Sequence, residues 1–463
     1  MSRNASYTQE YLDEIARLDG DTAGRRAART HMEHSTAIYH GRVVDSCYVP
    51  RLYDKQTYRR LKDIAETTHR ILEKVMREYL SNPAYRSVYE LDPRLVDLIL
   101  LPRGYDALLP FSRVDVFLNE DTMDAAFCEF NADGSSGMNE NREITASIAN
   151  TEAFRAFSAK HVVSTCNEEL FDGWVSEFLH IYDTYEHRVS HPHVAIVDFL
   201  ESAITEEFKI FAKLFAERGV ECSVYDVRDL RFDGEHLIGV KAFYGRDNAI
   251  IDAAWRRSVT NDIMEHWDTS QPLIEAVRAQ KVALIGSFAG HLVHDKQIFQ
   301  VLFKPETQAL LTPEENAFVQ ETVPFTAFLD ESEVNLDEVK ATRERWIIKP
   351  TDAYGSKDVY AGRDCDDDEW AHIIDAHANG AAGAPFIVQR YCTPHRTLTL
   401  PLYGDEADIT RENALAYNNL LGLYVYNGRF TGVFSRLGPE PVICKKTRGV
   451  TAATIWVDDD EAE

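Results

Sequence analysis

Two short strand patterns separated by one amphipathic helical pattern constrain the fold of this chain most. Residues 193–198, His-Val-Ala-Ile-Val-Asp, form a brief apolar run typical of a buried strand. Residues 206–218 then place apolar side chains on one side of a predicted helix, and residues 222–227 supply a second strand. Such a βαβ unit builds a parallel sheet, whose ligands bind at the carboxyl ends of the strands. We therefore expect a chain of the α/β (α+β) class.

The length and charge of the chain narrow its organisation and its partners. At 463 residues it is too long for one ordinary core, so two or three lobes are expected. The formal net charge is −27. A phosphate backbone would repel so acidic a protein unless it had a concentrated basic face, and the sequence holds no Lys/Arg block of that kind. Nucleic acid is therefore not an expected partner.

The cysteines and the hydropathy pattern predict the compartment. The chain has an odd number of cysteines without any Cys-x-x-Cys motif, at positions 47, 128, 166, 222, 365, 392 and 444. This scatter fits a reducing cytosol better than a disulfide framework or a zinc site. No apolar stretch is long enough to span a bilayer, and the first residues lack the apolar core of a signal peptide. We expect a soluble cytoplasmic protein without a membrane partner.

Other segments have readable patterns. Residues 1–110 are mostly helical in character, and the clearest helix spans 56–80, with Asp54 as its N-cap and Asn82-Pro83 as its end. Further strands are expected at three places late in the chain, namely 345–350, 385–389 and 421–426.

An acidic pair of strand patterns suggests a metal site. Residues 112–118 and 125–131 read as a hairpin joined by a polar turn. Residues two apart on a strand share a face, so Arg113 and Asp115 lie on one face of the first strand, and Glu129 and Asn131 on one face of the second. If the strands pair, the four side chains converge. Two carboxylates and an amide oxygen suit Mg²⁺ shared with phosphate, and an arginine there could neutralise a transferring phosphoryl group.

The loop that follows, residues 132–137, reads Ala-Asp-Gly-Ser-Ser-Gly. Its backbone N–H groups and hydroxyls could hold an anion such as a substrate carboxylate or its acyl phosphate. Each fragment alone is also consistent with solvent-facing strand residues and an ordinary turn.

Two separated lysines form a second candidate group. Lys296 precedes an apolar helical pattern, and Lys349 ends an apolar strand that leads into a small-residue loop. A partly buried lysine usually has an anionic partner, and the loop could close over phosphates, although the spacing is not that of a Walker P-loop. Surface lysines at element ends remain the alternative. Gln389 ends another apolar strand, which is either the backbone of an adenine pocket or an ordinary core strand.

Together these pieces resemble the circularly permuted branch of the ATP-grasp family that includes the synthetase domain of glutathionylspermidine synthase. That family carries an Arg-x-Asp, then a Glu-x-Asn, then two separated lysines with a glycine-rich loop after the second. Unpermuted ATP-grasp chains have the lysines first. The resemblance covers about residues 95–450 and extends to the segments 251–257, which ends in paired arginines, and 434–438, Phe-Ser-Arg-Leu-Gly.

The resemblance implies a role for each matched position. It implies ATP and Mg²⁺ as cofactors. Arg113 would stabilise the acyl phosphate and the transferring phosphoryl. The remaining candidates are Asp115, Glu129 and Asn131 for Mg²⁺; Lys296, Lys349, Gly355, Ser356 and Gln389 for ATP; and Ser135, Ser136, Arg256 and Arg257 for substrate. Because the catalytic segments begin near residue 113, we expect no cysteine–histidine amidase domain before them and no hydrolysis of glutathionylspermidine.

The implied architecture is a permuted ATP-grasp fold with a helical N-terminal region and a Rossmann-like βαβ lobe. Its expected divisions are 1–110, helical; 111–190, metal and substrate binding; 191–285, the βαβ lobe; 286–457, ATP binding and return to the core; and 458–463, an acidic tail. The implied activity joins a small-molecule or peptide carboxylate to an amine through an acyl phosphate. An inactive ATP-binding protein and an ATP-grasp phosphotransferase remain alternatives, and the substrates, the general base and the oligomeric state are not given by the sequence.

Overall fold

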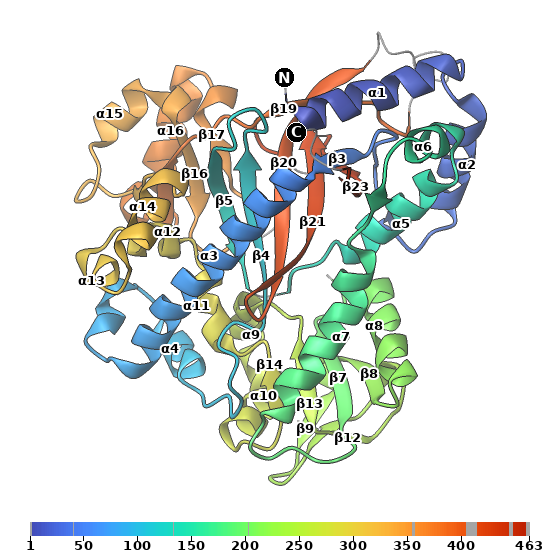
Figure 1. Cartoon of the computed structure of the whole chain (residues 1–463). Helices are drawn as coiled ribbons and strands as arrows, with labels where there is room; N and C mark the ends of the chain where they lie inside the picture. The colour runs from blue at the N-terminus through green and yellow to red at the C-terminus, as the bar shows by residue number, and fades with distance from the viewer. Residues whose placement is uncertain are drawn as a thin grey trace.

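A computed structural model shows a mixed arrangement of helices and sheets (Figure 1). It describes residues 2–39, 41–132, 134–201, 203–353, 357–403, 414–443 and 448–459.

A six-stranded antiparallel sheet occupies the centre of the molecule (Figure 1). Its main path is β22 (Val450–Ala452), β21 (Arg429–Gly438), β20 (Leu415–Tyr426), β4 (Phe111–Leu118) and β5 (Ala125–Asn131), while β19 (Arg396–Thr399) pairs with β20. The hairpin expected at 112–131 is therefore confirmed as β4 and β5. The strand expected at 421–426 is the second half of the longer β20. The sheet thus joins an early segment of the chain to a late one.

Helix α3 (Lys55–Ser81) covers one face of this sheet and confirms the helix expected at 56–80 (Figure 1). Asp54 is its N-cap, and its carboxylate accepts a hydrogen bond of 2.7 Å from the backbone N–H of Thr57. Leu61, Ile64 and Val75 of the helix lie in one apolar core with alternate residues of β4. Burying each such side chain contributes about 1.5–3 kcal/mol. The opposite face of β4, which carries Arg113 and Asp115, is left for other contacts.

A second sheet has the order β11 (Ala242–Tyr244), β8 (Glu221–Asp226), β7 (His193–Asp198), β13 (Ala253–Arg256) and β14 (Ala283–Ile285). The four strands from β8 to β14 are parallel, and β11 is antiparallel to β8. Strand β7, helix α8 (Thr205–Glu217) and β8 form the βαβ unit expected at 193–227. The chain moves to one side of β7 for β8 and to the other for β13 and β14. The connections at the carboxyl ends of β7 and β13 therefore lead in opposite directions, and ligands bind at this position in such sheets.

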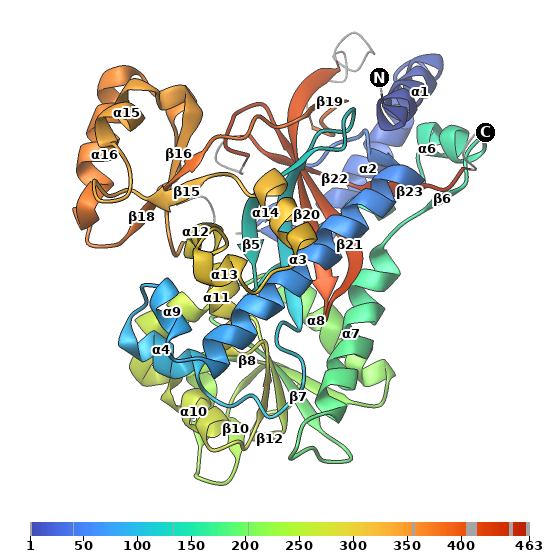
Figure 2. The same cartoon turned by 60° about the vertical axis from the view of Figure 1, so that its left-hand side comes forward.

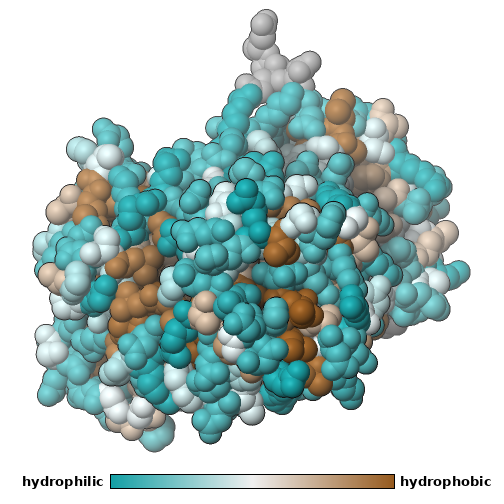
Figure 3. Space-filling view, turned by 90° about the horizontal axis from the view of Figure 1, so that it is seen from below, coloured by the Kyte–Doolittle hydropathy of each residue, from teal (hydrophilic) through white to brown (hydrophobic). Residues whose placement is uncertain are grey.

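Both faces of the parallel sheet are buried. Val194 and Ile196 point into a core with α7 (Asn167–Asp183) and α8, while Ala195 and Val197 point into a core with α10 (Trp267–Arg278). A small sheet of β9 (Leu230–Phe232), β10 (Leu237–Gly239) and β12 (Ala249–Ile251) lies beside them. Seen from below, hydrophilic side chains cover most of the surface, and hydrophobic ones gather in separate areas (Figure 3).

A third sheet stands to one side of the central sheet (Figure 2). It comprises β15 (Thr326–Phe328), β18 (Phe386–Arg390), β16 (Trp346–Pro350) and β17 (Tyr360–Ala361), all antiparallel. Strands β16 and β18 confirm the strands expected at 345–350 and 385–389. Helices α15 (Leu336–Ala341) and α16 (Asp367–His377) share a core with this sheet around the buried Trp370.

Segments from both ends of the chain meet in a further sheet, β3 (Arg51–Asp54), β23 (Thr454–Val457) and β6 (Val163–Ser164). The remaining α-helices of the described residues are α1 (Arg3–Arg17), α2 (Thr22–Glu33), α4 (Pro93–Ile99), α5 (Met138–Ala149), α6 (Glu152–Ser158), α9 (Thr260–Glu265), α11 (His291–His294), α12 (Gln297–Val301), α13 (Pro305–Gln308) and α14 (Pro313–Thr322). The two short strands β1 (Ile38–Tyr39) and β2 (Arg42–Val43) pair with each other. Among these helices and those above, none combines the length and apolar character needed to cross a bilayer.

Candidate active site

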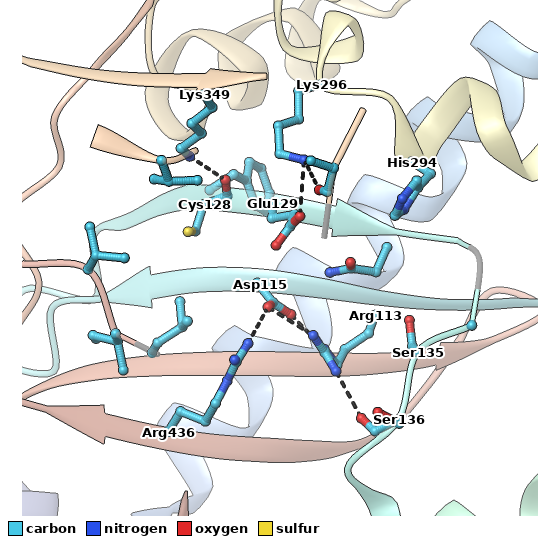
Figure 4. Close-up of a pocket in the computed structure, with 18 of the residues that line it drawn as sticks. Arg113, Asp115, Cys128, Glu129, Ser135, Ser136, His294, Lys296, Lys349 and Arg436 are labelled. Carbon is cyan, nitrogen blue, oxygen red and sulfur yellow. Dashed lines mark hydrogen bonds and ion pairs between the residues drawn. The ribbon is translucent and has the colours of Figure 1, made fainter. Parts of the chain in front are cut away.

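A cavity of about 280 Å³ lies where the β4–β5 hairpin, the carboxyl edge of the parallel sheet and the β16–β18 sheet meet. Most of the residues singled out in the sequence line it, although they come from segments up to 276 positions apart, between residues 113 and 389. These are Arg113, Asp115, Glu129, Asn131, Ser135, Ser136, Arg257, Lys296, Lys349 and Gln389. Several appear in Figure 4. Gly355 and Ser356 lie outside the described residues, and Arg256 is not part of the lining.

The register of the hairpin brings its four candidate residues opposite each other. Arg113 is the partner of Asn131, and Asp115 is the partner of Glu129. Between Asp115 and Val116 the register shifts, because β5 contains one extra residue at Cys128. Such a bulge re-aims the side chains that follow it.

The consequence of the bulge is visible in the core. Ala125 and Phe127 point into the core beneath α3 before the bulge, and Phe130 and Ala132 do so after it. With strict alternation, Glu129 would share the face of Phe127 and point into that apolar core. The extra residue instead brings Glu129 and Asn131 to the cavity. The position of the Glu129 carboxylate in the cavity therefore depends on a local irregularity of the strand.

Asp115 is held by two arginines (Figure 4). Arg113 donates from Nε to Oδ1 of Asp115 at 2.7 Å and from Nη2 to Oδ2 at 3.1 Å. Arg436 of β21 donates to Oδ2 at 3.1 Å. Burial disfavours the charge of Arg113, but Asp115 outweighs it and raises the pKa of the guanidinium above its ordinary value. The ring of Phe434 lies against both guanidinium groups, 5.7 and 5.6 Å from their central carbons, so both cations are fixed in orientation.

The two lysines extend toward strand β5 from the other side (Figure 4). Lys296, between α11 and α12, places Nζ 3.3 Å from Oε1 of Glu129 and donates to the carbonyl oxygen of Ala353 at 2.9 Å. Lys349, on β16, donates to the carbonyl oxygen of Cys128 at 3.1 Å and to Oε1 of Gln389 at 2.9 Å. Both lysines are buried. They are buried cations that face a carboxylate and neutral oxygens.

The lysines also set the charge of Glu129. Burial would raise the pKa of this carboxyl group, but Lys296, His294, Lys349 and Arg113 outweigh it and lower the pKa to about 2. Glu129 is therefore ionised at neutral pH and can act as an oxygen ligand. Ten Lys, Arg, Asp and Glu side chains line the cavity, six of them cations and four of them anions. Their sum is positive in a strongly acidic protein, as a site for a polyphosphate requires.

The loop after the hairpin is fixed at both ends. Gly134 has φ +61°, and a Cβ there would lie 2.3 Å from the carbonyl oxygen of Arg257. Gly137 has φ +106°, and a Cβ there would lie 3.0 Å from the ring of Phe434. The carbonyl oxygen of Ser136 accepts a hydrogen bond of 2.9 Å from Nη1 of Arg113. Only glycine fits the first position, so the loop stays close to the parallel sheet.

Three buried polar atoms around this loop lack a hydrogen-bond partner among the described residues. They are Oγ of Ser135, Nδ2 of Asn131 and Nε of Arg257, and their residues all line the cavity. Arg257 is otherwise paired with Glu207, with Nη1 and Nη2 each 3.2 Å from Oε1. Unpartnered buried polar groups are costly, so they indicate a polar ligand at this position.

Two candidates differ from the rest in their contacts. Arg256 donates to the carbonyl oxygens of Gly286 and Ser258 at 2.6 Å each and to that of Ser287 at 3.1 Å, so its guanidinium connects backbone segments. Gln389 lines the cavity, but its side chain is bonded to Lys349 and, through Nε2 at 2.9 Å, to Thr326. Contact with adenine would then use the backbone.

Several lining residues had not been assigned a role from the sequence, notably Arg436, His294 and Asp198. Arg436 belongs to the segment 434–438, whose resemblance to the family pattern implies no role for its arginine. His294 is adjacent to the Asp295-Lys296 pair. Asp198 is the last residue of an expected strand, at the sheet edge where ligands bind, and this position was the available signal.

The donor atoms fit Mg²⁺ shared with a phosphate ligand. The described residues contain no group of three or more His, Cys, Asp and Glu side chains that could hold a metal ion alone. Asp115, Glu129 and Asn131 offer two carboxylates and an amide, all hard oxygen donors facing one cavity. Mg²⁺ is usually held by one or two carboxylates together with substrate phosphates and water, so this set matches its preference.

Comparison with known proteins identifies the fold. No protein-family model matches the sequence, and no curated protein matches it either. A glutathione synthetase-like effector from Globodera pallida, in its apo form, has a similar structure, with a TM-score of 0.61 and 9% identity over 94% of this chain and 96% of the effector. The chain therefore shares the fold of a glutathione synthetase-like protein.

Two other solved structures have weaker likeness. A putative gamma-glutamylcysteine synthetase from Methylobacillus flagellatus has a TM-score of 0.29 at 10% identity over 81% of this chain and 84% of its own. The ATP-grasp ligase PsnB, complexed with a phosphomimetic variant of its minimal precursor, Mg and ADP, has a TM-score of 0.23 at 14% identity over 54% of this chain and 90% of its own. At these TM-scores the likeness is too weak to show a shared fold.

Proposed function

We propose that this chain is an ATP-dependent carboxylate–amine ligase that forms an amide bond through an acyl phosphate. One observation carries the proposal: the register-paired Arg113, Asp115, Glu129 and Asn131 face two buried lysines across one cavity. Separate parts of the chain supply these groups, so chance proximity of single motifs does not account for them. The shared fold with a glutathione synthetase-like protein agrees with this function.

The first step transfers the γ-phosphoryl group of ATP to a substrate carboxylate. Two anions must approach each other, so charge neutralisation matters more than an enzyme nucleophile. Lys296 and Lys349 would hold the phosphates, and Arg113 and Arg436 would face the transferring group. Asp115, Glu129 and Asn131 would hold Mg²⁺, which when bound supplies further positive charge at the phosphates. The carboxylate would lie against the Ser135 hydroxyl, which lacks a protein partner among the described residues.

The second step is attack of an amine on the acyl carbon with loss of phosphate. The substrates would be a small-molecule or peptide carboxylate and an amine. We further propose that the catalytic parts follow the permuted ATP-grasp order, resembling glutathionylspermidine synthase, because the Arg-x-Asp and Glu-x-Asn strands precede both lysines in the chain. The six cysteines that the structure describes are free thiols, which supports the cytoplasmic location proposed from their scatter.

The test measures ADP formation with Mg²⁺ and ATP across a panel of carboxylates and amines, glutathione and polyamines included. Glu129→Gln serves as the control, because it keeps the size of the side chain and removes the charge. We expect turnover that needs both a carboxylate and an amine and that falls at least about a hundredfold in the control.

Hydroxylamine separates the ligase from a phosphotransferase on the same fold. It traps an acyl phosphate as a hydroxamate but leaves a stable phosphoester unchanged. ADP formation without hydroxamate would indicate phosphoryl transfer to a hydroxyl or guanidinium group and contradict the ligase. ATP binding without turnover across the panel would favour an inactive nucleotide-binding protein.

A further inference from the structure

Two aspartates end neighbouring strands of the parallel sheet but have different surroundings. Asp198 is the last residue of β7, Asp226 is the last residue of β8, and the two are register partners. Asp226 accepts from Nε and Nη2 of Arg228 at 2.7 Å each and does not line the cavity. Asp198 lines the cavity and is half-buried. The same strand-end position thus serves an ion pair in one case and faces the active site in the other.

The partners of Asp198 leave its carboxylate available to a ligand. Oδ1 accepts a hydrogen bond of 2.8 Å from the backbone N–H of Phe199. Within the part of the chain that the structure describes, no lysine, arginine or histidine forms an ion pair with it. The charged groups that face it are Arg257 after β13, Asp262 on α9 and Asp226 on β8.

The loop that carries Ser135 is hydrogen-bonded to two arginines of the cavity, Arg257 and Arg113. Nη2 of Arg257 donates to the carbonyl oxygen of Gly134 at 3.5 Å, and Nη1 of Arg113 donates to that of Ser136 at 2.9 Å. Ser135 lies between these two attachments and lines the same cavity as Asp198. An acyl phosphate at Ser135 would therefore have the phosphoryl-binding arginine on one side and the wall that carries Asp198 on the other.

We propose that Asp198 is the general base of the second step, receiving a protonated primary amine from the side of the parallel sheet and accepting one of its protons. This inference rests on the proposed ligase function. Asp262 lines the same wall and adds negative charge that favours an approaching cation over an anion. Arg257 is paired with Glu207, which reduces its repulsion of that cation.

The protons of the ammonium group are accounted for in this step. One goes to Asp198 before attack, which frees the nitrogen lone pair. The nitrogen then forms the bond to the acyl carbon, the bond from that carbon to the phosphate oxygen breaks, and phosphate leaves. A second proton departs with the leaving group as hydrogen phosphate, and the third remains on the amide nitrogen. The carboxylate of Asp198 is regenerated by release of its proton to water.

The ionisation of Asp198 suits this role. Burial raises its pKa, Arg257 and the backbone of Phe199 oppose the rise, and Asp262 and Asp226 add to it, so the pKa reaches about 7. A base with a pKa near the working pH is the most effective, because it is both available and strong. In Asp226, burial also pushes the pKa upward, but hydrogen bonds from Arg228 outweigh it and the pKa lies below its ordinary value.

The experiment compares wild type, Asp198→Asn and the matched control Asp226→Asn in the full chain. ATP, Mg²⁺ and the carboxylates of the panel are first supplied with hydroxylamine, which is largely neutral at neutral pH and needs no base. Each carboxylate that gives a hydroxamate is then supplied with ethylamine, glycine or spermidine between about pH 6 and 9. We expect Asp198→Asn to form hydroxamate within about threefold of wild type and to form amide at least about a hundredfold more slowly.

The outcomes separate the two proposals. Absence of hydroxamate in wild type refutes the ligase itself, and the base with it. Equal loss of hydroxamate and amide in Asp198→Asn shows a role in folding or in the first step and overturns the base alone. Unchanged amide formation in Asp198→Asn, or hydroxamate without amide in wild type, also overturns it. In wild type the amide-forming rate should rise until about pH 7 and then level off, and Asp226→Asn should show the same profile. In Asp198→Asn the levelling near pH 7 should disappear, because the rate then follows the fraction of free amine.

Discussion

Replacement of Gly422 by alanine tests how tightly the sheet holds Arg113, the arginine proposed to act in catalysis. Gly422 lies inside β20, opposite Asp115 of β4, and a Cβ there would be 2.8 Å from Cδ and 2.9 Å from Nε of Arg113. It would also be 3.1 Å from Oδ1 of Asp115. A glycine inside a strand often marks such a close approach. The Arg113 side chain has to move if a methyl group is added.

The structure sets the size of the effect. Overpacking costs about 1–3 kcal/mol. The displaced guanidinium would also lose its hydrogen bond to Ser136, and bonds to charged groups contribute about 1.5–3 kcal/mol each. Within a strand, alanine is more favourable than glycine by about 0.5–1 kcal/mol, and this offsets a part of the cost. We expect a net destabilisation of about 1.5–5.5 kcal/mol in urea-induced unfolding, and ADP formation at least about tenfold slower because Arg113 is misplaced.

Gly173→Ala is the matched control. Gly173 lies in α7, where the nearest atom to an added Cβ is Nη2 of Arg429 at 3.7 Å, so alanine should stabilise the helix by up to about 1 kcal/mol without loss of activity. A double-mutant cycle with Arg113→Ala isolates the cause, because the cost of Gly422→Ala should shrink once the Arg113 side chain is gone. The reasoning is refuted if Gly422→Ala is neutral, or if its cost is the same in both backgrounds.

Three further predictions follow from the same geometry. Lys349→Met should weaken ATP binding about ten- to a hundredfold in calorimetry. The control Lys340→Met, which removes an exposed ion pair with Asp375 in the same lobe, should not weaken it, and equal affinities of the two variants would show that Lys349 does not bind the phosphates. Gly134→Ala should abolish hydroxamate formation and leave ATP binding intact, because the added methyl group would clash with the carbonyl oxygen of Arg257. The control Gly234→Ala, at a glycine with φ +96° and no atom within 4 Å of an added Cβ, should be active, and hydroxamate from the Gly134 variant would contradict the fixed loop. Asp198→Asn should gain stability relative to wild type as the pH rises from about 4 to 7, because the Asp198 carboxyl group of the wild type stays protonated in the folded state over that range and ionises in the unfolded state. A difference in the free energy of unfolding in urea that does not vary with pH would contradict the raised pKa.

Local patterns predicted the separate elements of the site. The alternation in residues 112–118 and 125–131 indicated two strands, and their register joins Arg113 with Asn131 and Asp115 with Glu129. The apolar run 193–198 and the helix after it indicated a parallel sheet, which the pairing of β7 with β8 confirms. These patterns depend on neighbours in sequence, which is why the sequence reveals them.

Features that depend on distant segments were not predictable in the same way. The bulge at Cys128 turns Glu129 away from the core, but strict alternation would have placed it beside Phe127. Arg436 reaches Asp115 from a strand 321 residues later. The difference between Asp198 and Asp226 depends on Arg228, which lies two residues after the second aspartate, and on the cavity that forms beside the first.

The acidity of the whole chain and the proposed binding of ATP are reconciled by how the cations are held. Lys349 is hydrogen-bonded to Oε1 of Gln389 and to the backbone carbonyl oxygen of Cys128, so neutral oxygens satisfy this cation without cancelling its charge. A phosphate that displaces such an oxygen gains an ion pair in a buried position.

Buried charges are screened much less than surface charges, because mobile ions cannot enter between them. The affinity for ATP should therefore change little between about 0.1 and 1 M salt. The net charge of −27 means that the protein surface repels an anion at low salt, so surface charges do not favour ATP binding. Calorimetric titration of ATP over that range measures the dependence. A steep loss of affinity with salt would mean that exposed cations hold the nucleotide, and Lys296 and Lys349, both buried, would then not be its main partners.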